Sequence, residues 1–176
     1  MNTHADIIEA CKTGDRQAQF RLYQLYSKAM FNICSRMLGN TSLAEDALQE
    51  AFISAFSKLH TYQGRASFGA WLKRIVINKC LSTIKKNRIQ YESLEDHQYH
   101  IEDLVEELPK RESKIDPRKV HQAIKELPDG CRVIFTLYQM EGYDHKEISS
   151  ILGITESTAK SQYHRAKKLL RKKLAN

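Results

Sequence analysis

Residues 144–170, DHKEISSILGITESTAKSQYHRAKKLL, contain the signals of two short helices joined by a tight turn. Asp144 suits an N-cap, and Glu147 stands three residues later, as in a capping box. Gly153 ends this helix, and Thr155 is the expected N-cap of the next one. This pattern predicts a helix-turn-helix.

The second of these helices has an apolar face and a polar face. Four residues recur at helical spacing and should pack inward: Ala159, Tyr163, Ala166 and Leu170. The opposite face suits a DNA major groove, because arginine can bind guanine, glutamine can bind adenine, and small side chains allow close approach: Thr158, Ser161, Gln162 and Arg165. Further cations can neutralise phosphates: Lys160, Lys167, Lys168 and Arg171. The alternative is an ordinary helical hairpin with a solvated basic face.

Charge divides the chain into three segments. Residues 1–89 carry 13 basic and 6 acidic side chains, residues 90–115 carry 3 and 8, and residues 116–176 carry 12 and 7. The acidic middle segment has few large apolar residues, which is typical of a solvated linker, although a charged loop without a function fits equally well. We therefore expect a domain boundary there.

Helical periodicity also dominates the first segment. Apolar residues recur at helical spacing over residues 17–38, and Gly39 follows as a stop. Ser42 and Glu45 form a capping-box pattern that predicts a helix to about residue 60. A third helix is expected over residues 68–86. Since no segment alternates with period two long enough to indicate a strand, the chain is predicted to be all-α.

A polar patch interrupts the apolar pattern of the 42–60 helix. Asp46, Gln49 and Glu50 stand at positions i, i+3 and i+4, so they share one face. From the pattern alone, this is either a binding surface or simply a solvated face.

The loop over residues 62–68, YQGRASF, combines aromatic rings with a cation and a glycine. The following helix carries Trp71 and, on one face, Arg74, Asn78 and Lys85. Aromatic rings beside cations are what single-stranded DNA requires, because bases stack on rings and the backbone needs positive charge. The alternative is that Trp71 belongs to the core.

Composition narrows the class of protein. The 176 residues suffice for one ordinary domain or two small ones, and a net charge of +7 favours nucleic acid or an anionic membrane as partner. No apolar run approaches the length that crosses a bilayer, and the polar start MNTHADIIEA does not resemble a signal peptide, so we expect a cytoplasmic protein without membrane insertion. The cysteines are far apart and form no CxxC pair, which favours reduced buried thiols over disulfides or zinc: Cys11, Cys34, Cys80 and Cys131.

Two stretches resemble a known family. Residues 44–52, AEDALQEAF, together with the 64–68 loop and the Trp71 helix, resemble region 2 of the sigma-70 family of RNA polymerase sigma factors. Residues 127–166 resemble region 4. Both motifs, in this order in so short a chain, resemble the extracytoplasmic-function group. The resemblance implies two small helical domains, a region 2 bundle in residues 1–89 and a region 4 helix-turn-helix in residues 116–176, joined by an acidic linker over residues 90–115.

The resemblance also implies a role for individual residues. The helix that binds the clamp coiled coil of the polymerase beta-prime subunit is matched by Asp46, Gln49, Glu50 and Phe52. The loop and helix that capture minus-ten DNA are matched by Tyr62, Gln63, Gly64, Arg65, Ser67, Phe68, Trp71, Arg74 and Asn78. The helix that reads the minus-thirty-five element is matched by Thr158, Lys160, Ser161, Gln162, His164 and Arg165. Ala159, Gln162 and Tyr163 depart from the usual family residues, which concerns the promoter sequence that is read and not the role.

The partners implied are RNA polymerase core, through the beta-prime clamp and the beta flap, together with promoter DNA. An anti-sigma factor, often membrane-bound in this family, usually masks the polymerase-binding surfaces. The linker in similar proteins runs through polymerase toward the active-site cleft, where acidic residues follow the path of RNA.

Two other classes of protein are alternatives. A conventional helix-turn-helix regulator explains residues 116–176 but gives no reason for the Asp46 patch or the 62–68 loop. An enzyme is disfavoured because HExxH and glycine-rich phosphate loops are absent from the sequence, and its histidines are scattered. No catalytic residue, cofactor or metal is therefore expected.

Overall fold

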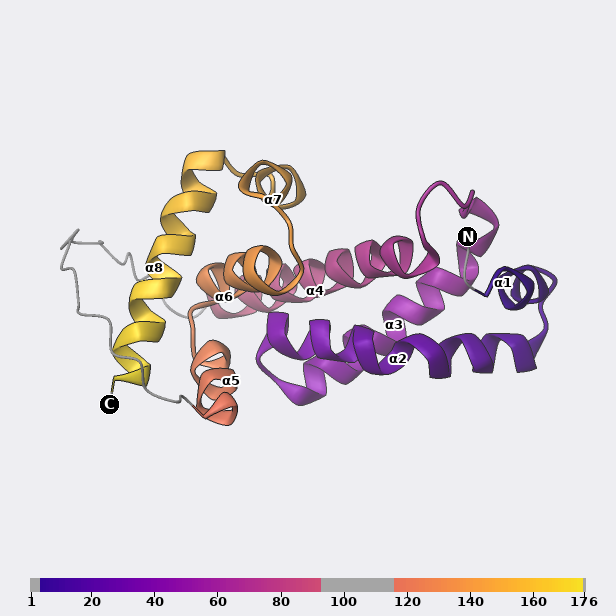
Figure 1. The fold of residues 1–176 in the computed structure, drawn as a ribbon, viewed down its shortest axis with the longest axis horizontal. Coiled ribbons are helices and arrows are strands. Elements are labelled where there is room, and N and C mark those ends of the chain that lie inside the picture. Colours follow the sequence, from indigo (N-terminus) through magenta and orange to yellow (C-terminus); the bar gives the residue numbers. More distant parts are fainter. Residues whose placement is uncertain (1–3, 93–115, 176) are drawn as a thin grey trace.

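The computed structural model describes residues 4–92 and 116–175, and within these ranges its regular structure is helical, without a strand. The first range, here called the first block, contains α1 (Ala5–Lys12), α2 (Arg16–Leu38), α3 (Thr41–Ser57), the 3-10 turn η1 (Leu59–Thr61) and α4 (Phe68–Glu92). The second block contains α5 (Pro117–Lys125), α6 (Asp129–Phe135), the π-helical turn η2 (Thr136–Met140), α7 (His145–Leu152) and α8 (Glu156–Leu174) (Figure 1). The all-α prediction is confirmed.

Some helix boundaries differ from the sequence analysis. Helix α1 was not predicted. Helix α4 continues to Glu92 instead of ending near residue 86. The N-cap of α3 is Asn40 and not Ser42, because the Asn40 side chain accepts a hydrogen bond from the Leu43 N–H at 3.0 Å. Gly39 ends α2 with a φ of 67°, so the next residue is already extended and can serve as the cap. The predicted linker begins inside α4 and from residue 93 lies outside the described residues.

The core of the first block lies between α2, α3 and α4. The inward face of α3 consists largely of small residues, which allows its backbone to approach both neighbours: Ala44, Ala47, Ala51 and Ala55. Leu22 of α2 and Leu72 and Val76 of α4 fill the space between the helices and are fully buried. This packing leaves the opposite face of α3 in solvent.

The helix-turn-helix of the second block has the predicted caps. Asp144 accepts from the Glu147 N–H at 2.7 Å, while the Glu147 carboxylate accepts from the Asp144 N–H at 2.8 Å. Gly153 adopts a φ of 67°, and the Thr155 hydroxyl accepts from the Thr158 N–H at 3.1 Å. The capping box, turn and second cap are therefore confirmed.

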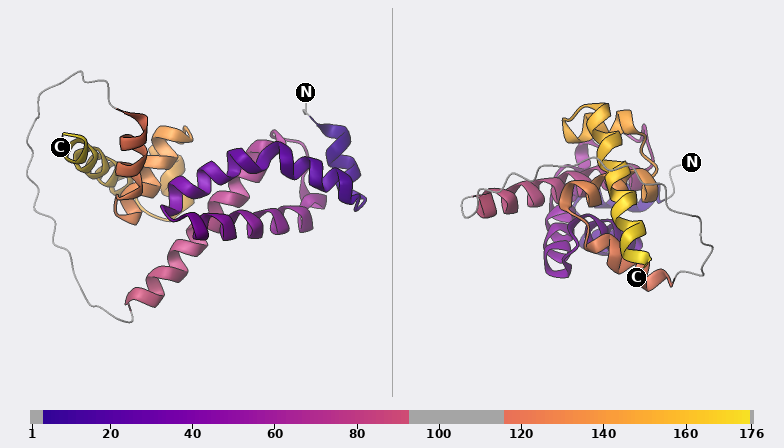
Figure 2. Two further views of the ribbon diagram at one scale, coloured as in Figure 1. Left: turned by 90° about the horizontal axis from the view of Figure 1, so that it is seen from below. Right: turned by 90° about the vertical axis from the view of Figure 1, so that its left-hand side faces the viewer.

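The two blocks contact each other. The C-terminal end of α2 packs against α5, α6 and η2, and Figure 2 shows this end of α2 reaching the second block. Buried side chains from both blocks belong to one continuous apolar cluster, including Met37 and Leu38 of α2 and Val133, Ile134 and Leu137 of the second block.

Candidate protein and nucleic-acid interfaces

The polar patch of α3 faces solvent. Asp46, Gln49 and Glu50 are all exposed. Lys79 of α4 forms an ion pair with the Glu50 carboxylate and holds the pKa of Glu50 below its ordinary value. Glu50 therefore stays ionised and paired with Lys79, next to the neutral amide of Gln49.

An apolar side chain lies within this polar patch. Ile53 follows Gln49 and Glu50 by one helical turn and is 70% exposed. The sequence analysis did not select it, although an isoleucine on an otherwise polar face was the available signal. An exposed apolar residue ringed by polar groups is typical of a protein interface.

Phe52 does not belong to that exposed surface. It is 4% exposed and packs edge-on against Tyr23 of α2, with 4.8 Å between the ring centroids. In this arrangement Phe52 supports the patch from beneath and cannot itself contact a partner.

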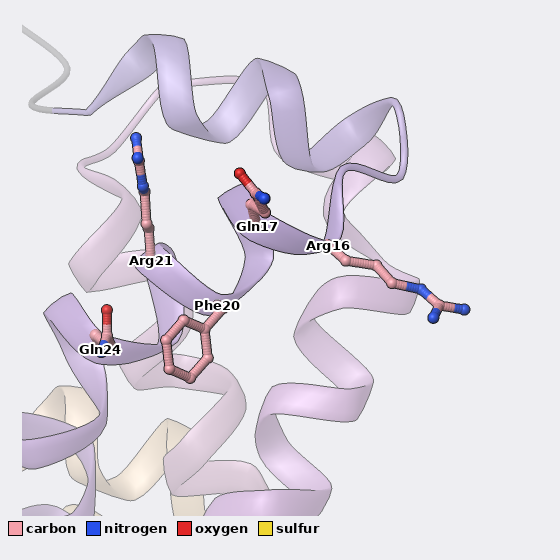
Figure 3. Close-up of a pocket in the computed structure, with 5 residues that line it drawn as sticks. All are labelled: Arg16, Gln17, Phe20, Arg21 and Gln24. Carbon is pink, nitrogen blue, oxygen red and sulfur yellow. The ribbon is translucent and has the colours of Figure 1, made fainter.

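A second exposed apolar side chain lies on the first turns of α2. There Phe20 is largely exposed and lies within a shallow hollow whose lining comes entirely from α2, as Figure 3 shows: Arg16, Gln17, Phe20, Arg21 and Gln24. This second apolar position is flanked by cations, whereas Ile53 is flanked by acids. The two surfaces therefore differ in the charge that they offer to a partner.

The 62–68 loop is organised around packed aromatic rings. The Tyr62 hydroxyl donates to the Ala66 carbonyl oxygen at 2.8 Å, which closes the loop. The Tyr62 ring lies 5.6 Å from Phe68 and 5.4 Å from Trp71, and Tyr26 of α2 covers Phe68 from the other side at 5.1 Å. Tyr62 and Phe68 are consequently buried and Trp71 is half-buried. The expectation that these rings stand open for base stacking is corrected for Tyr62 and Phe68.

The surface of this loop is polar. Gln63, Gly64, Arg65 and Ser67 are exposed, and Gly64 adopts a φ of 70°. On α4, Arg74, Asn78 and Lys85 are exposed, as their shared helical face predicts. The structure thus brings a cationic rim and a half-buried indole together on one side of the first block.

The predicted recognition face of α8 is largely exposed, with two exceptions. Four of the predicted residues face solvent: Thr158, Lys160, Ser161 and His164. Arg165 is half-buried. Gln162 is also half-buried, and its side-chain oxygen accepts a hydrogen bond from the Cys131 thiol at 3.2 Å. Gln162 therefore turns toward α6, which the spacing along α8 did not predict.

An aromatic cluster fixes α8 against the rest of the helix-turn-helix. The rings of Tyr138 and His145 stack at 4.4 Å, and Tyr138 lies 4.5 Å from Tyr163 of α8. The Tyr163 hydroxyl donates to the Gln139 side-chain oxygen at 2.9 Å. Tyr163, which departs from the usual family residue, thus contacts η2 and α7 at once. The sequence analysis placed Tyr163 inward but missed its partners.

Residues 4–92 and 116–175 contain no group of three or more His, Cys, Asp or Glu side chains that could hold a metal ion. None of the helices described there is long and apolar enough to span a bilayer. The four cysteines are buried, with free thiols.

Comparison with known proteins identifies both blocks. Residues 22–89 match the sequence model of sigma-70 region 2, and residues 118–170 match that of sigma-70 region 4. The ECF RNA polymerase sigma factor SigW of Bacillus subtilis is 31% identical over 95% of this chain and 94% of its own length. The RNA polymerase sigma-H factor of Pseudomonas aeruginosa is 28% identical over 96% of this chain and 92% of its own.

Two solved structures share the fold. The sigma factor RpoE of Bartonella quintana, in complex with the anti-sigma factor NepR, gives a TM-score of 0.60 at 21% identity over 88% of this chain and 95% of its own. CnrH, in complex with the cytosolic domain of CnrY, gives 0.54 at 18% identity over 94% and 92%.

Proposed function

The chain belongs to the extracytoplasmic-function group of the sigma-70 family and directs promoter-specific transcription initiation with RNA polymerase, and from this premise we propose how its exposed surfaces divide that work. The observation that carries the function is the match to region 2 and region 4 in order along one short chain, together with 31% identity to a sigma factor over nearly its full length. The roles of individual residues below are part of the proposal.

The outward face of α3 binds the clamp coiled coil of the beta-prime subunit. Asp46, Gln49 and Glu50 supply polar contacts around Ile53, which we add as the apolar centre of the contact. Burial of an apolar centre within a polar ring is the usual arrangement of strong contacts at interfaces. Phe52 keeps this helix in place against α2.

The polar rim of the 62–68 loop and α4 binds the non-template strand of the minus-ten element. Arg65 and Arg74 neutralise its backbone, and Trp71 offers the accessible part of a ring to an unpaired base. Tyr62 and Phe68 form the floor beneath this surface. Opened DNA is preferred because an unpaired base can reach the accessible part of the Trp71 ring and a paired base cannot.

The second block reads the minus-thirty-five element with α8 and contacts the beta flap. Ser161, His164 and Arg165 contact the major groove, and the basic C-terminal part of α8 contacts phosphates. Gln162 contributes if it exchanges its bond to Cys131 for a base edge.

The remaining expectations form the rest of the proposal. The chain acts in the cytoplasm, performs no catalysis of its own, and is held inactive by an anti-sigma factor that masks its polymerase-binding surface. The solved relatives that share the fold are described in complex with NepR or CnrY, which supports a partner of this kind.

The polymerase-binding role is tested with the double variant Asp46→Ala and Gln49→Ala. Because both side chains are exposed, the variant should keep its helical circular dichroism and its unfolding midpoint while losing core polymerase in a pull-down. The control is Asp6→Ala, an exposed acid on α1, which should retain wild-type binding. Wild-type recovery of core by the double variant would remove α3 from the polymerase contact.

A further inference from the structure

The two blocks are joined by a buried arginine. Arg132 of α6 is 7% exposed. Its Nε donates to the Met37 carbonyl oxygen at 3.0 Å, and its Nη2 donates to that of Leu38 at 3.2 Å, so it binds the last turn of α2 in the other block. Within its own block it donates to the carbonyl oxygens of Lys125 and Leu127, at 3.0 and 2.8 Å, and pairs with Asp129.

This arrangement satisfies the whole guanidinium group. Arginine has five N–H donors, and the structure supplies five acceptors, four of them backbone carbonyls at or beside the C-terminal ends of α2 and α5. Those ends carry partial negative charge, which a cation stabilises. The fit is close, because a Cβ added at Gly39 would lie 3.1 Å from Arg132 Cζ. Arg132 therefore joins two helix ends that belong to different blocks.

A second contact between the blocks is ionic. The Glu141 side chain is 5% exposed, and its carboxylate lies 2.6 Å from the Arg36 guanidinium of α2 and 3.0 Å from Lys73 Nζ of α4. Over the described residues, the ion pairs that cross between the blocks both end on Glu141. Arg36 Nε is buried without a hydrogen-bond partner, which lowers the net stability of the contact.

In this arrangement the two proposed DNA-binding surfaces lie too close together for a promoter. The minus-ten and minus-thirty-five elements lie about 25 base pairs apart, or about 85 Å along the duplex at roughly 3.4 Å per base pair. Arg74 of the minus-ten surface adjoins Lys73, which touches Glu141, and α8 lies within the same small domain as Glu141. A domain of about 60 residues is about 27 Å across, so Arg74 and α8 lie within about 40 Å of each other. They cannot engage both elements together.

We propose that Arg132 and Glu141 form a latch that holds the chain in a closed, promoter-incompatible arrangement, and that RNA polymerase core captures the chain after the latch opens. The inhibitory part rests on the function proposed above, whereas the closed arrangement itself does not. Glu141 is the better site to test, because its ion pairs cross between the blocks, whereas Arg132 also supports the fold of its own block.

The test measures the distance between the blocks in the free full-length chain. Spin labels are placed at Lys58→Cys and Lys172→Cys, two exposed positions in different blocks, and the distance distribution is recorded by double electron–electron resonance. The four native thiols are buried, so labelling can be restricted to the new sites. Wild type should give one narrow distribution, and Glu141→Gln should shift a large fraction to longer, broader distances. Arg36→Gln should act similarly, and the two changes together should add little.

The matched control is Glu126→Gln, which removes a carboxylate that pairs with Lys173 inside the second block. It should leave the distribution unchanged. A broad, long distribution for wild type, or a Glu141→Gln distribution identical to wild type, would overturn the latch.

The inhibitory role is then measured as affinity for core polymerase. If closure competes with binding, Glu141→Gln should bind core about fivefold more tightly than wild type, since a binding-competent fraction sets the apparent affinity. A variant that opens yet binds core with unchanged affinity overturns the inhibitory role. Wild type that fails to bind core at all contradicts the proposed function instead, while the distance measurement still decides the latch.

Discussion

The two proposed DNA surfaces are built in opposite ways. In the 62–68 loop the aromatic rings of Tyr62 and Phe68 are packed against each other and against Tyr26, and only polar groups reach the surface. On α8 the groups that can meet base edges are already exposed on a rigid helix, apart from the half-buried Gln162 and Arg165. A surface for duplex DNA can be complete before binding. A surface for an unpaired base instead needs a firm aromatic floor, because a single strand has no fixed shape to match.

The largest effect is expected at Phe68, which lies beneath the proposed minus-ten surface. Phe68 is 3% exposed and contacts three other rings, so Phe68→Ala should destabilise the fold by about 3–5 kcal/mol. Arg74→Ala, on the exposed side of the same helix, should stay within about 0.5 kcal/mol of wild type. Urea unfolding compares the two. Equal stability of Phe68→Ala and wild type would show that the ring is not part of the core.

The α8 surface should respond in affinity and not in stability. Arg165→Ala should cost about 1–3 kcal/mol on the preferred minus-thirty-five sequence and reduce the preference among base variants. Lys168→Ala should weaken all variants alike and make the log-log salt slope shallower by about one. Titration of holoenzyme against single-base variants at several salt concentrations distinguishes them. If the two variants exchange these behaviours, the recognition face lies on the other side of α8.

A smaller effect distinguishes the buried Tyr62 from the exposed Arg65 within the 62–68 loop. Tyr62→Phe removes the hydroxyl that donates to Ala66, so it should cost about 0.5–1.5 kcal/mol in urea unfolding and leave promoter opening near wild type. Arg65→Ala should leave stability unchanged and reduce opening, measured as permanganate reactivity of holoenzyme complexes. Normal opening by Arg65→Ala on a range of promoters would remove the rim from DNA capture.

The smallest expected effect is a pH dependence where α5 meets α2. His121 is exposed, but partial desolvation and the charges of Lys125 and Arg36 lower its pKa below the ordinary value of 6.5. The folded chain therefore binds a proton at His121 less readily than the unfolded chain, so stability should decrease as the pH falls below about 6.5. Chemical unfolding at pH 7.5 and 5.5 measures the decrease, and His121→Gln should reduce it. An identical decrease in His121→Gln would assign the effect to other groups.

Local patterns in the sequence predicted much of this molecule. The helix-turn-helix, its two caps and the inward stripe of α8 follow from residues within one or two helical turns of each other, and the same holds for the exposed α3 patch. Helix periodicity and capping chemistry act over that range, so a sequence displays them directly.

The features that the sequence analysis missed depend on side chains from distant helices. Phe52 was expected in the polymerase contact, yet Tyr23 covers it from α2. Gln162 was expected to face DNA, yet Cys131 binds it from α6. Spacing along one helix shows only roughly which way a side chain points. For a residue between the buried and the exposed face, the neighbouring helix decides whether it is covered.

By itself, therefore, the amino-acid sequence determined most of the helices, the caps of the helix-turn-helix, the order of the two blocks and the family. Only the tertiary structure decided which aromatic rings are buried and which residues join the blocks. Arg132 binds Leu38 across 94 residues of sequence, and Glu141 binds Arg36 across 105. Such contacts form between residues that share no periodicity. They depend on how whole helices pack, which no local pattern records.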